Sequence, residues 1–237
     1  MPDNDTASTD KYIKALMDIS QAINSDLYLE DILKLIVMVT AKVTGVEICS
    51  LWLVDENGKN PKIRLAATQT IEPVYVKDRV LDIREGVVGY VASEKRPLIV
   101  RDVLSEPLFK EKDMARSLSL KSLASVPLRL RDDRVIGVLN CFTAETHEFT
   151  DTEVNLITTV ANQAAVAIMN SELIIKTKVI QEELETRKLV ERAKEVLMAR
   201  RSLDADEAYR RIQKKSMDSR KSMRSIAEAI LLSEELY

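Results

Sequence analysis

The spacing of apolar and polar positions predicts an α+β fold over the first part of the chain. Apolar residues at helical spacing predict two helices near its start. The first helix is carried by Ile13, Leu16, Met17 and Ile23. The second helix, which Gly45 would end, is carried by Ile32, Leu33, Ile36, Val39 and Val43.

The positions that follow alternate in polarity and predict two β-hairpins. A turn at 55–58, with the sequence Asp-Glu-Asn-Gly, joins the first pair of strands. One face of its leading strand holds Val46, Ile48, Ser50, Trp52 and Val54. Two later strands, 123–130 and 135–143, flank a polar turn, and Pro127 indicates an edge position or a bulge. Helices around antiparallel hairpins give a sheet flanked by helices.

A long helix is predicted from Asp151 onward, with Thr150 and Glu153 forming a capping box at its start. Its first apolar positions are Val154, Ile157, Val160, Ala161, Ala164, Ala165 and Ile168. A later seam, spaced 4, 3 and 4 as in a coiled coil, consists of Leu173, Thr177, Ile180 and Leu184. Because a solvated helix cannot hide this seam, we expect a parallel homodimer through the connecting helix. The alternative is a helix folded back onto its own domain.

The end of the chain predicts a bundle of three amphipathic helices. The first stripe is Leu189, Val190, Ala193, Val196 and Leu197. Asp204 and Glu207 form a capping box for the second helix, whose stripe is Ala205, Ala208, Tyr209, Ile212, Ser216 and Met217. The third helix would start at Ser219 or Ser222, with Met223, Ile226, Ala227, Ile230 and Leu231 as its stripe. Helices this short need one another to be stable, so we expect them to pack together.

Composition narrows the functional classes. The 237 residues carry 35 Lys+Arg against 38 Asp+Glu and are 46% apolar, which allows a sizeable core. Two cysteines and one histidine exclude a disulfide framework and leave little for metal binding or acid/base catalysis. No apolar run reaches the length of a membrane span, and the start lacks the order of a signal peptide. We therefore expect a cytoplasmic protein with no metal site, no membrane partner and no enzymatic activity.

Charge is concentrated late in the chain, where residues 187–224 hold 13 basic and 6 acidic side chains. On an acidic protein such a cluster is typical of a polyanion site, although a charge run is often only a solvated face. The candidate contacts are Arg192, Lys194, Arg200, Arg201, Arg210, Arg211, Lys214, Lys215, Arg220 and Lys221. Tyr209, beside two of these cations, could stack an unpaired base or lie at the edge of the core.

Two motifs in the first part resemble those of GAF domains. One is Gly-Val-Val-Gly-Tyr-Val-Ala at 86–92, read as a short helix, with Arg-Pro-Leu-Ile-Val-Arg-Asp at 96–102, whose centre reads as a strand. The other is Ser-Val-Pro-Leu at 125–128 with Val-Ile-Gly-Val-Leu-Asn at 135–140. The resemblance spans roughly residues 10–170 and implies a GAF-like sensor whose input, a small-molecule effector or a partner protein, is unidentified. It also implies pocket positions at Tyr75, Tyr90, Arg101 and Phe109, while Cys49, Cys141 and His147 read as structural residues.

The late segment resembles the ANTAR output domain over roughly residues 180–237. The resemblance rests on Val-Glu-Arg-Ala-Lys-Glu-Val-Leu-Met at 190–198 and Asp-Glu-Ala-Tyr-Arg-Arg-Ile-Gln-Lys at 206–214. It implies an RNA-binding transcription antiterminator whose dimer grips paired hairpin loops in nascent mRNA. The sequence departs from the family by lacking a glycine after the first of these helices and by having Ser216 in place of alanine.

The combined hypothesis is a signal-responsive antitermination regulator with four segments. These are a disordered tail at 1–10, a sensor at 11–170, a coiled-coil linker at 171–186 and an RNA-binding domain at 187–237. The main alternative is a GAF-regulated, helix-turn-helix DNA-binding transcription factor, but its last helix would be acidic after Arg224. An enzyme and a pure interaction module are further alternatives.

Overall fold

The computed structural model describes residues 13, 14, 17, 19–21, 28–55, 61–76 and 79–235. Two compact units are distinguished, Met1–Ser171 and Glu172–Tyr237. One helix, α6 (Asp151–Arg201), begins in the first unit and ends in the second. In the described part of the chain, no helix is both long and apolar enough to cross a lipid bilayer.

The first unit is built on a six-stranded antiparallel sheet with the order β3-β2-β1-β6-β5-β4. Its strands are β1 (Ile48–Asp55), β2 (Lys62–Thr68), β3 (Val80–Asp82), β4 (Leu98–Val100), β5 (Ser122–Arg129) and β6 (Val135–Thr143). The two long predicted hairpins, β1–β2 and β5–β6, are joined at the centre of the sheet through β1 and β6. The predicted turn after Asp55 lies largely outside the described residues.

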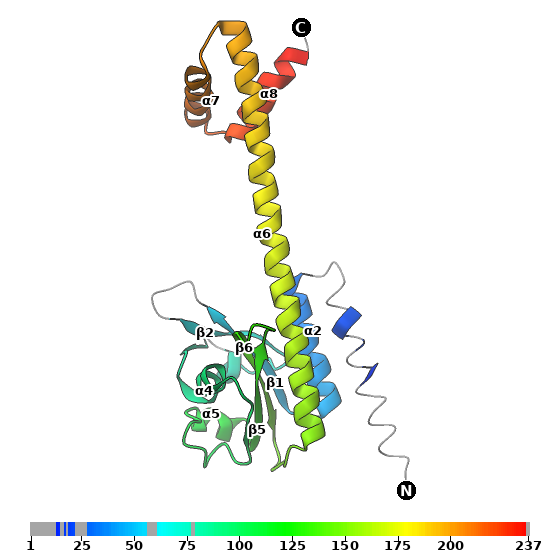
Figure 1. Cartoon of the computed structure of the whole chain (residues 1–237). Helices are drawn as coiled ribbons and strands as arrows, with labels where there is room; N and C mark the ends of the chain where they lie inside the picture. The colour runs from blue at the N-terminus through cyan, green and yellow to red at the C-terminus, as the bar shows by residue number, and fades with distance from the viewer. Residues whose placement is uncertain are drawn as a thin grey trace. The chain divides into compact units, whose positions relative to one another are not determined.

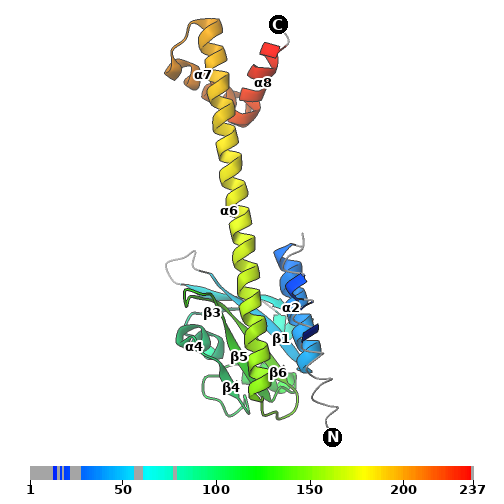
Figure 2. The ribbon, with the colours of Figure 1, turned by 45° about the vertical axis from the view of Figure 1, so that its right-hand side comes forward.

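Helices cover both faces of this sheet, which confirms the predicted fold class (Figure 1). One face is covered by α2 (Leu29–Thr44) and the first part of α6, which lie side by side in both views (Figures 1 and 2). The other face carries α3 (Pro73–Val76), α4 (Gly86–Glu94) and α5 (Lys112–Ser117). Because both faces are covered, β1 buries consecutive residues from Ile48 to Trp52 rather than alternate ones.

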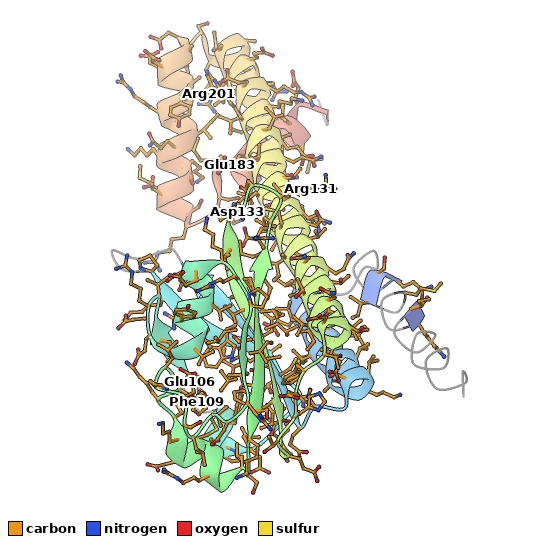
Figure 3. All side chains as sticks on the ribbon, turned by 60° about the horizontal axis from the view of Figure 1, so that its bottom comes forward. Glu106, Phe109, Arg131, Asp133, Glu183 and Arg201 are labelled. Carbon is orange, nitrogen blue, oxygen red and sulfur yellow. The ribbon has the colours of Figure 1, made fainter. Side chains whose placement is uncertain are left out.

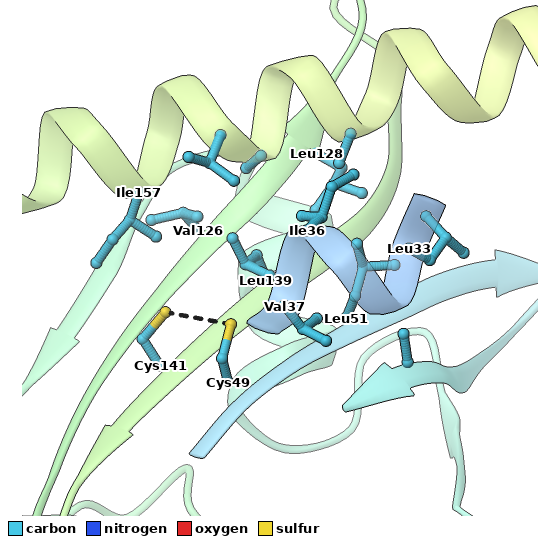
Figure 4. Packing of buried hydrophobic residues seen from close by; sticks show 14 of the residues in the cluster. Leu33, Ile36, Val37, Cys49, Leu51, Val126, Leu128, Leu139, Cys141 and Ile157 are labelled. Carbon is cyan, nitrogen blue, oxygen red and sulfur yellow. Dashed lines mark hydrogen bonds between the residues drawn. The ribbon is translucent and has the colours of Figure 1, made fainter. Parts of the chain in front are cut away.

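The core between the sheet and the helix pair is apolar and closely packed (Figure 4). Leu33, Ile36 and Val37 of α2 meet the central strands there. Six of the seven predicted positions of α6 join them, namely Ile157, Val160, Ala161, Ala164, Ala165 and Ile168, whereas Val154 is only partly buried and lies outside this core. The early part of α6 therefore folds back onto its own unit. The seam from Leu173 onward is not packed into this core, because Leu173, Ile180 and Leu184 are all at least half exposed.

Local sequence signals determine where most of the helices and strands end. Gly45 ends α2 with a left-handed φ of 71°, as predicted. Thr150 and Glu153 cap α6 reciprocally, with Thr150 N to Glu153 Oε2 at 2.7 Å and Glu153 N to Thr150 Oγ1 at 3.3 Å. Pro127 lies beyond the stretch of β5 that pairs with β4, and a register shift follows at Leu128/Arg129. The predicted edge or bulge character of Pro127 is therefore confirmed.

The first predicted helix is described only in part. Leu16 and Ile23 lie outside the described residues, as does the tail at 1–10. The described positions around them are helical, but Ile13 and Met17 are exposed and Ile19 is the buried residue. The face predicted for this helix is therefore wrong at Ile13 and Met17.

The second unit packs the end of α6 against α7 (Ala205–Ser219) and α8 (Met223–Glu235). The centre of this three-helix core consists of Val190, Ala193, Ile212, Ile226 and Ala227. Asp204 and Glu207 form the predicted capping box of α7. At α8, Ser222 accepts a hydrogen bond from Ser225 N at 3.1 Å, so Ser222 is the cap, whereas Ser219 is the last residue of α7.

The apolar stripe predicted for α7 is narrower than expected. Ala208 and Ile212 are buried, whereas Ala205, Tyr209 and Met217 are exposed. With 3.6 residues per turn, Ala208 and Ile212 define one line along the helix, and Tyr209 and Met217 lie to one side of it. The predicted bundle forms, but Tyr209 is not part of its core.

Candidate nucleic-acid interface

The cations predicted to bind RNA are presented by two helices and the turn after α7. Arg192, Arg200 and Arg201 lie on the last turns of α6, and all three are exposed (Figure 3 labels Arg201). The exposed cations of α7 and the following turn are Arg210, Arg211, Lys214, Lys215, Arg220 and Lys221. Lys194 differs because it is largely buried and its Nζ pairs with Glu191 Oε2 at 2.8 Å.

The nine exposed cations lack acidic partners, in contrast to several cations of the first unit. There, Lys62, Arg64 and Lys95 lie 2.5 Å, 3.0 Å and 3.3 Å from carboxylate oxygens. Among the described residues at 187–224, ion pairs engage Lys194 and Arg224. The nine exposed predicted cations form no side-chain hydrogen bond or ion pair within the described part of the chain. Their charge is therefore not neutralised by other described residues of the chain.

Tyr209 lies on one edge of α7, 41% exposed, and lines a groove of about 630 Å³ against α6 and α8. We call this the Tyr209 groove. Its apolar surface comes from Val179, Val190, Tyr209 and Met223, and its polar rim is Glu182, Glu183, Thr186, Arg187 and Glu191. Three carboxylates against one guanidinium make this edge acidic, so it favours hydrogen-bond donors over phosphates. Glu183 is labelled in Figure 3.

The opposite edge of α7 lines a second groove, of about 300 Å³, which we call the basic groove. Its cations are Arg201 from α6 and Arg211 and Lys215 from α7. Its other lining residues are Leu197, Ile212, Ile226, Ala229, Ile230 and Ser233. The structure thus brings three of the predicted cations together here and places Tyr209 at a different groove.

In the first unit, a cavity of about 130 Å³ opens on the side of the sheet that carries α4. Tyr75 and Phe109, both predicted, line it, and Figure 3 labels Phe109. The structure does not bring the other two predicted residues to this cavity. The Tyr90 hydroxyl accepts a hydrogen bond from Arg96 Nη2 at 2.9 Å, and the exposed Arg101 pairs with Glu148 at 3.6 Å.

Several residues of the cavity were not indicated by the sequence. Trp52, Asn140 and Phe142 line it from the central strands, and Glu85, Lys110 and Glu111 line it from the loops. Alternation along β1 placed Trp52 on a face with Ser50, but nothing in the sequence indicated which face would carry the cavity. Lys110 Nζ lies 3.5 Å from Glu85 Oε1 across this lining.

A buried polar network supports the cavity wall. The hydroxyls of Ser50 and Tyr75 lie 2.6 Å apart, and Trp52 Nε1 donates to Ser50 Oγ at 3.1 Å. Arg79 lies over the rings of Trp52 and Tyr75 and is ion-paired with Glu111. Burial raises the pKa of Tyr75 to about 12, so this phenol is neutral at ordinary pH. Burial also lowers the pKa of Arg79.

The cysteines and the histidine have structural surroundings. Cys49 and Cys141 oppose each other on β1 and β6, both fully buried, with sulfur atoms 3.8 Å apart (Figure 4). Burial raises the pKa of the Cys49 thiol, which disfavours the reactive thiolate. His147 Nε2 lies 3.1 Å from Glu153. Burial alone would raise the pKa of Glu153, but hydrogen bonds from Thr150 and His147 lower it.

Solved structures share the fold of the first unit. One is the GAF domain of a phosphoenolpyruvate-protein phosphotransferase from Coxiella burnetii, with a TM-score of 0.60 and 24% identity, over 69% of this chain and 95% of that one. Another is the free methionine-R-sulfoxide reductase of Neisseria meningitidis, with a TM-score of 0.58 and 21% identity, over 69% of this chain and 91% of that one. At such identities the likeness shows the fold alone.

A curated relative matches a shorter stretch. The transcriptional regulatory protein PdtaR of Mycobacterium tuberculosis is 44% identical over 52 residues, which are 22% of this chain and 25% of that protein. The match thus covers only a quarter of the relative's length. The GAF domain model matches residues 28–168, and the ANTAR domain model matches residues 178–231. The chain therefore belongs to the GAF-domain family and carries an ANTAR domain after its GAF domain.

Proposed function

We propose that this protein is a non-enzymatic transcription antitermination regulator whose ANTAR domain binds paired hairpin loops in nascent mRNA under control of the GAF domain. The single observation that carries the proposal is the set of nine exposed cations without acidic partners on one small unit. Such charge attracts a polyanion at long range and contacts its phosphates at short range. The exposed ring of Tyr209 adds a stacking surface.

Hairpin loops suit this surface better than a duplex. Single-stranded loops splay their bases, which can stack on a ring and present amino groups to acceptors. In the Tyr209 groove the neighbouring acceptors are Glu182, Glu183 and Glu191, which match the amino groups of a base edge. The phosphates would lie on the cations of α6 and α7. In this arrangement Tyr209 would contact a base and the cations would contact the phosphate backbone.

The alternative, a DNA-binding factor, requires a basic recognition helix in the major groove. The candidate helix α8 contains one cation, Arg224, and this guanidinium lies 2.9 Å from Glu228 and 3.6 Å from Glu185. Because α8 presents glutamates and its cation is already paired, it is poorly suited to approach a phosphate-lined groove.

We propose that two copies of the chain present two such surfaces, paired through α6. The exposed seam of Leu173, Thr177, Ile180 and Leu184 would form the contact. In a parallel coiled coil with this register, Glu183 lies opposite Lys188 of the partner subunit, which is an attractive pair. Binding two loops at once raises the effective affinity when their spacing matches that of the two surfaces.

The sensor part of the proposal rests on the cavity beside Tyr75 and Phe109. Its wall combines aromatic rings with the buried side chain of Asn140 and the charged groups of Glu85 and Lys110. A few polar groups in a mainly apolar cavity are typical of small-molecule sites, and at about 130 Å³ this cavity would hold only a ligand smaller than those of the usual sites of roughly 300–1,000 Å³. A small-molecule effector bound here would alter how the ANTAR domain is presented.

The function can be tested by selection and transcription. A pool of two-hairpin RNAs with randomised loops is selected on the full-length protein, and the winning RNA is placed before an intrinsic terminator. We expect the protein to increase readthrough by RNA polymerase in vitro, and we expect no effect on a template whose loops are scrambled. Equal readthrough with both templates would contradict the proposal.

A further inference from the structure

We propose that the basic groove of the ANTAR domain holds one unstacked nucleotide of the RNA loop, with its base on the apolar floor and its phosphate on the cationic rim. The inference rests on the proposed function and adds a second nucleotide site, apart from Tyr209. The site is formed where the end of α6 meets α7 and α8.

The charged side chains of the groove are all cationic. Arg201, Arg211 and Lys215 contribute its charged side chains, and the groove lining holds no carboxylate. None of the three cations forms an ion pair or a side-chain hydrogen bond within the described residues. Two guanidiniums and an ammonium around one opening provide several donors for phosphate oxygens, and the guanidiniums can bind bidentately.

The floor of the groove is apolar and anchored in the core. Ile212 and Ile226 are 1% and 7% exposed, and Leu197 and Ile230 are partly buried against the same cluster. Ala229 is exposed at the floor and leaves room above its methyl group. A volume of about 300 Å³ is at the lower end of the roughly 300–1,000 Å³ range of small-ligand sites. An apolar floor under a cationic rim matches a flat base joined to a phosphate.

Charge separates this groove from its neighbour across α7. The Tyr209 groove carries Glu182, Glu183 and Glu191, which would repel a phosphate, so a backbone that crosses α7 is drawn toward the basic groove. Arg210 and Lys214 are exposed between the two edges and can contact the same strand on its path. The difference in charge between the two grooves would therefore set the direction in which the RNA loop crosses α7.

The test fills the groove without changing its charge. Ala229→Phe places a ring on the floor, and Ala199→Phe makes the same exposed substitution on α6 outside either groove. In titrations of full-length protein with the selected two-hairpin RNA, we expect Ala229→Phe to weaken binding about tenfold and Ala199→Phe to change it less than twofold. Circular dichroism melting checks that both variants are folded, and Ala229→Leu serves if the larger ring perturbs the bundle.

A second experiment identifies the loop nucleotide that occupies the basic groove. Abasic substitutions are scanned through the loop, and each RNA is titrated with the unaltered protein and with Ala229→Phe. We expect one loop position at which removing the base abolishes the difference between the two proteins, because both changes then remove the same contact. Absence of such a position would overturn the inference.

The remaining outcomes separate this inference from the proposed function. If the unaltered protein selects no RNA, the proposed function itself fails. If it selects RNA but Ala229→Phe and Ala199→Phe bind alike, the basic groove holds no nucleotide and the proposed function stands. If polyglutamate binding falls as much as RNA binding in Ala229→Phe, the groove is a site for acidic peptides and the inference is wrong.

Discussion

Tyr209 shows that a residue can fit a sequence pattern and still lie in a different environment from the one that the pattern predicts. Its spacing placed it on the apolar stripe of α7, but its ring is 41% exposed and lines a groove with glutamates. Periodicity assigns a residue to one side of a helix to within about a third of a turn. This precision is too low to distinguish a core position from one at the edge of the core. The functional interpretation of Tyr209 therefore depends on its exposure.

Replacing the ring tests that interpretation. We expect Tyr209→Ala to weaken binding of the selected two-hairpin RNA by about tenfold, because one base loses its stacking surface. Tyr209→Phe keeps the ring and should bind within twofold of the unaltered protein. The melting temperature should change little in both variants, since the ring is half exposed and makes no side-chain hydrogen bond within the described residues. Equal binding by Tyr209→Ala and Tyr209→Phe would show that stacking is not the role of this residue.

Tyr75 gives a pH-dependent prediction in the GAF domain. Its pKa is raised by burial from 10.0 to about 12, so folding favours the neutral phenol. This contribution is fully present below pH 10 and is lost as the pH rises from 10 to 12, at a cost of roughly 3 kcal/mol. Trp52, the single tryptophan and fully buried, reports unfolding of this domain by its fluorescence.

The matched variant is Tyr75→Phe, which keeps the ring and removes the ionisable group. Urea titrations at pH 9, 10, 11 and 12 should show a steeper loss of unfolding free energy in the unaltered protein than in Tyr75→Phe. Parallel losses in the two proteins would mean that Tyr75 does not carry the alkaline transition.

At the scale of elements, the sequence was most informative where the chemistry is local. Both capping boxes, the glycine end of α2 and the hairpin turn between β5 and β6 depend on a few neighbouring residues. The end of α6 was harder to predict from the sequence because it lacks the usual glycine. Ser202 takes the left-handed conformation there, with a φ of 51°, which side chains other than glycine adopt at a cost. The sequence alone does not reveal which residue accepts that strain.

The contacts around the GAF cavity were harder still, because they join residues far apart in the chain. Arg79 meets Glu111 across thirty-two positions, and Ser50 meets Tyr75 across twenty-five. No periodic pattern encodes such pairs. The motif resemblance placed Tyr75 and Phe109 near the cavity but also suggested Tyr90 and Arg101, whose side chains make surface contacts instead.

The seam of α6 gives a prediction about pairing. If α6 forms a parallel coiled coil, Glu183→Lys or Lys188→Glu alone should weaken the dimer about tenfold, because each creates two like-charge contacts by symmetry. The double variant Glu183→Lys/Lys188→Glu should restore dimerisation, since the charges are only exchanged. Sedimentation equilibrium at low salt measures the dissociation constants. A double variant as weak as the single variants, or a monomer throughout, would contradict this register.

At the scale of the whole molecule, the distribution of glycine, proline and charge along the sequence separates the GAF domain from the ANTAR domain. All glycines and prolines lie at or before residue 137, and the cations gather after residue 187. The structure adds that GAF-domain cations such as Lys62, Arg64 and Lys95 are ion-paired. The nine exposed predicted cations of the ANTAR domain have no acidic partner among the described residues. This difference could not be predicted, because it depends on side-chain distances.

The most direct test of the account is a titration of the full-length protein with two-hairpin RNA and with duplex DNA of equal length across a salt series. If unpaired cations bind the RNA backbone while exposed rings and apolar floors hold bases, affinity for the RNA should fall with salt with a slope of several units, yet stay at least tenfold above that for DNA. A single-hairpin RNA should bind more weakly than the two-hairpin RNA. Equal affinity for RNA and duplex DNA at every salt concentration would contradict the account.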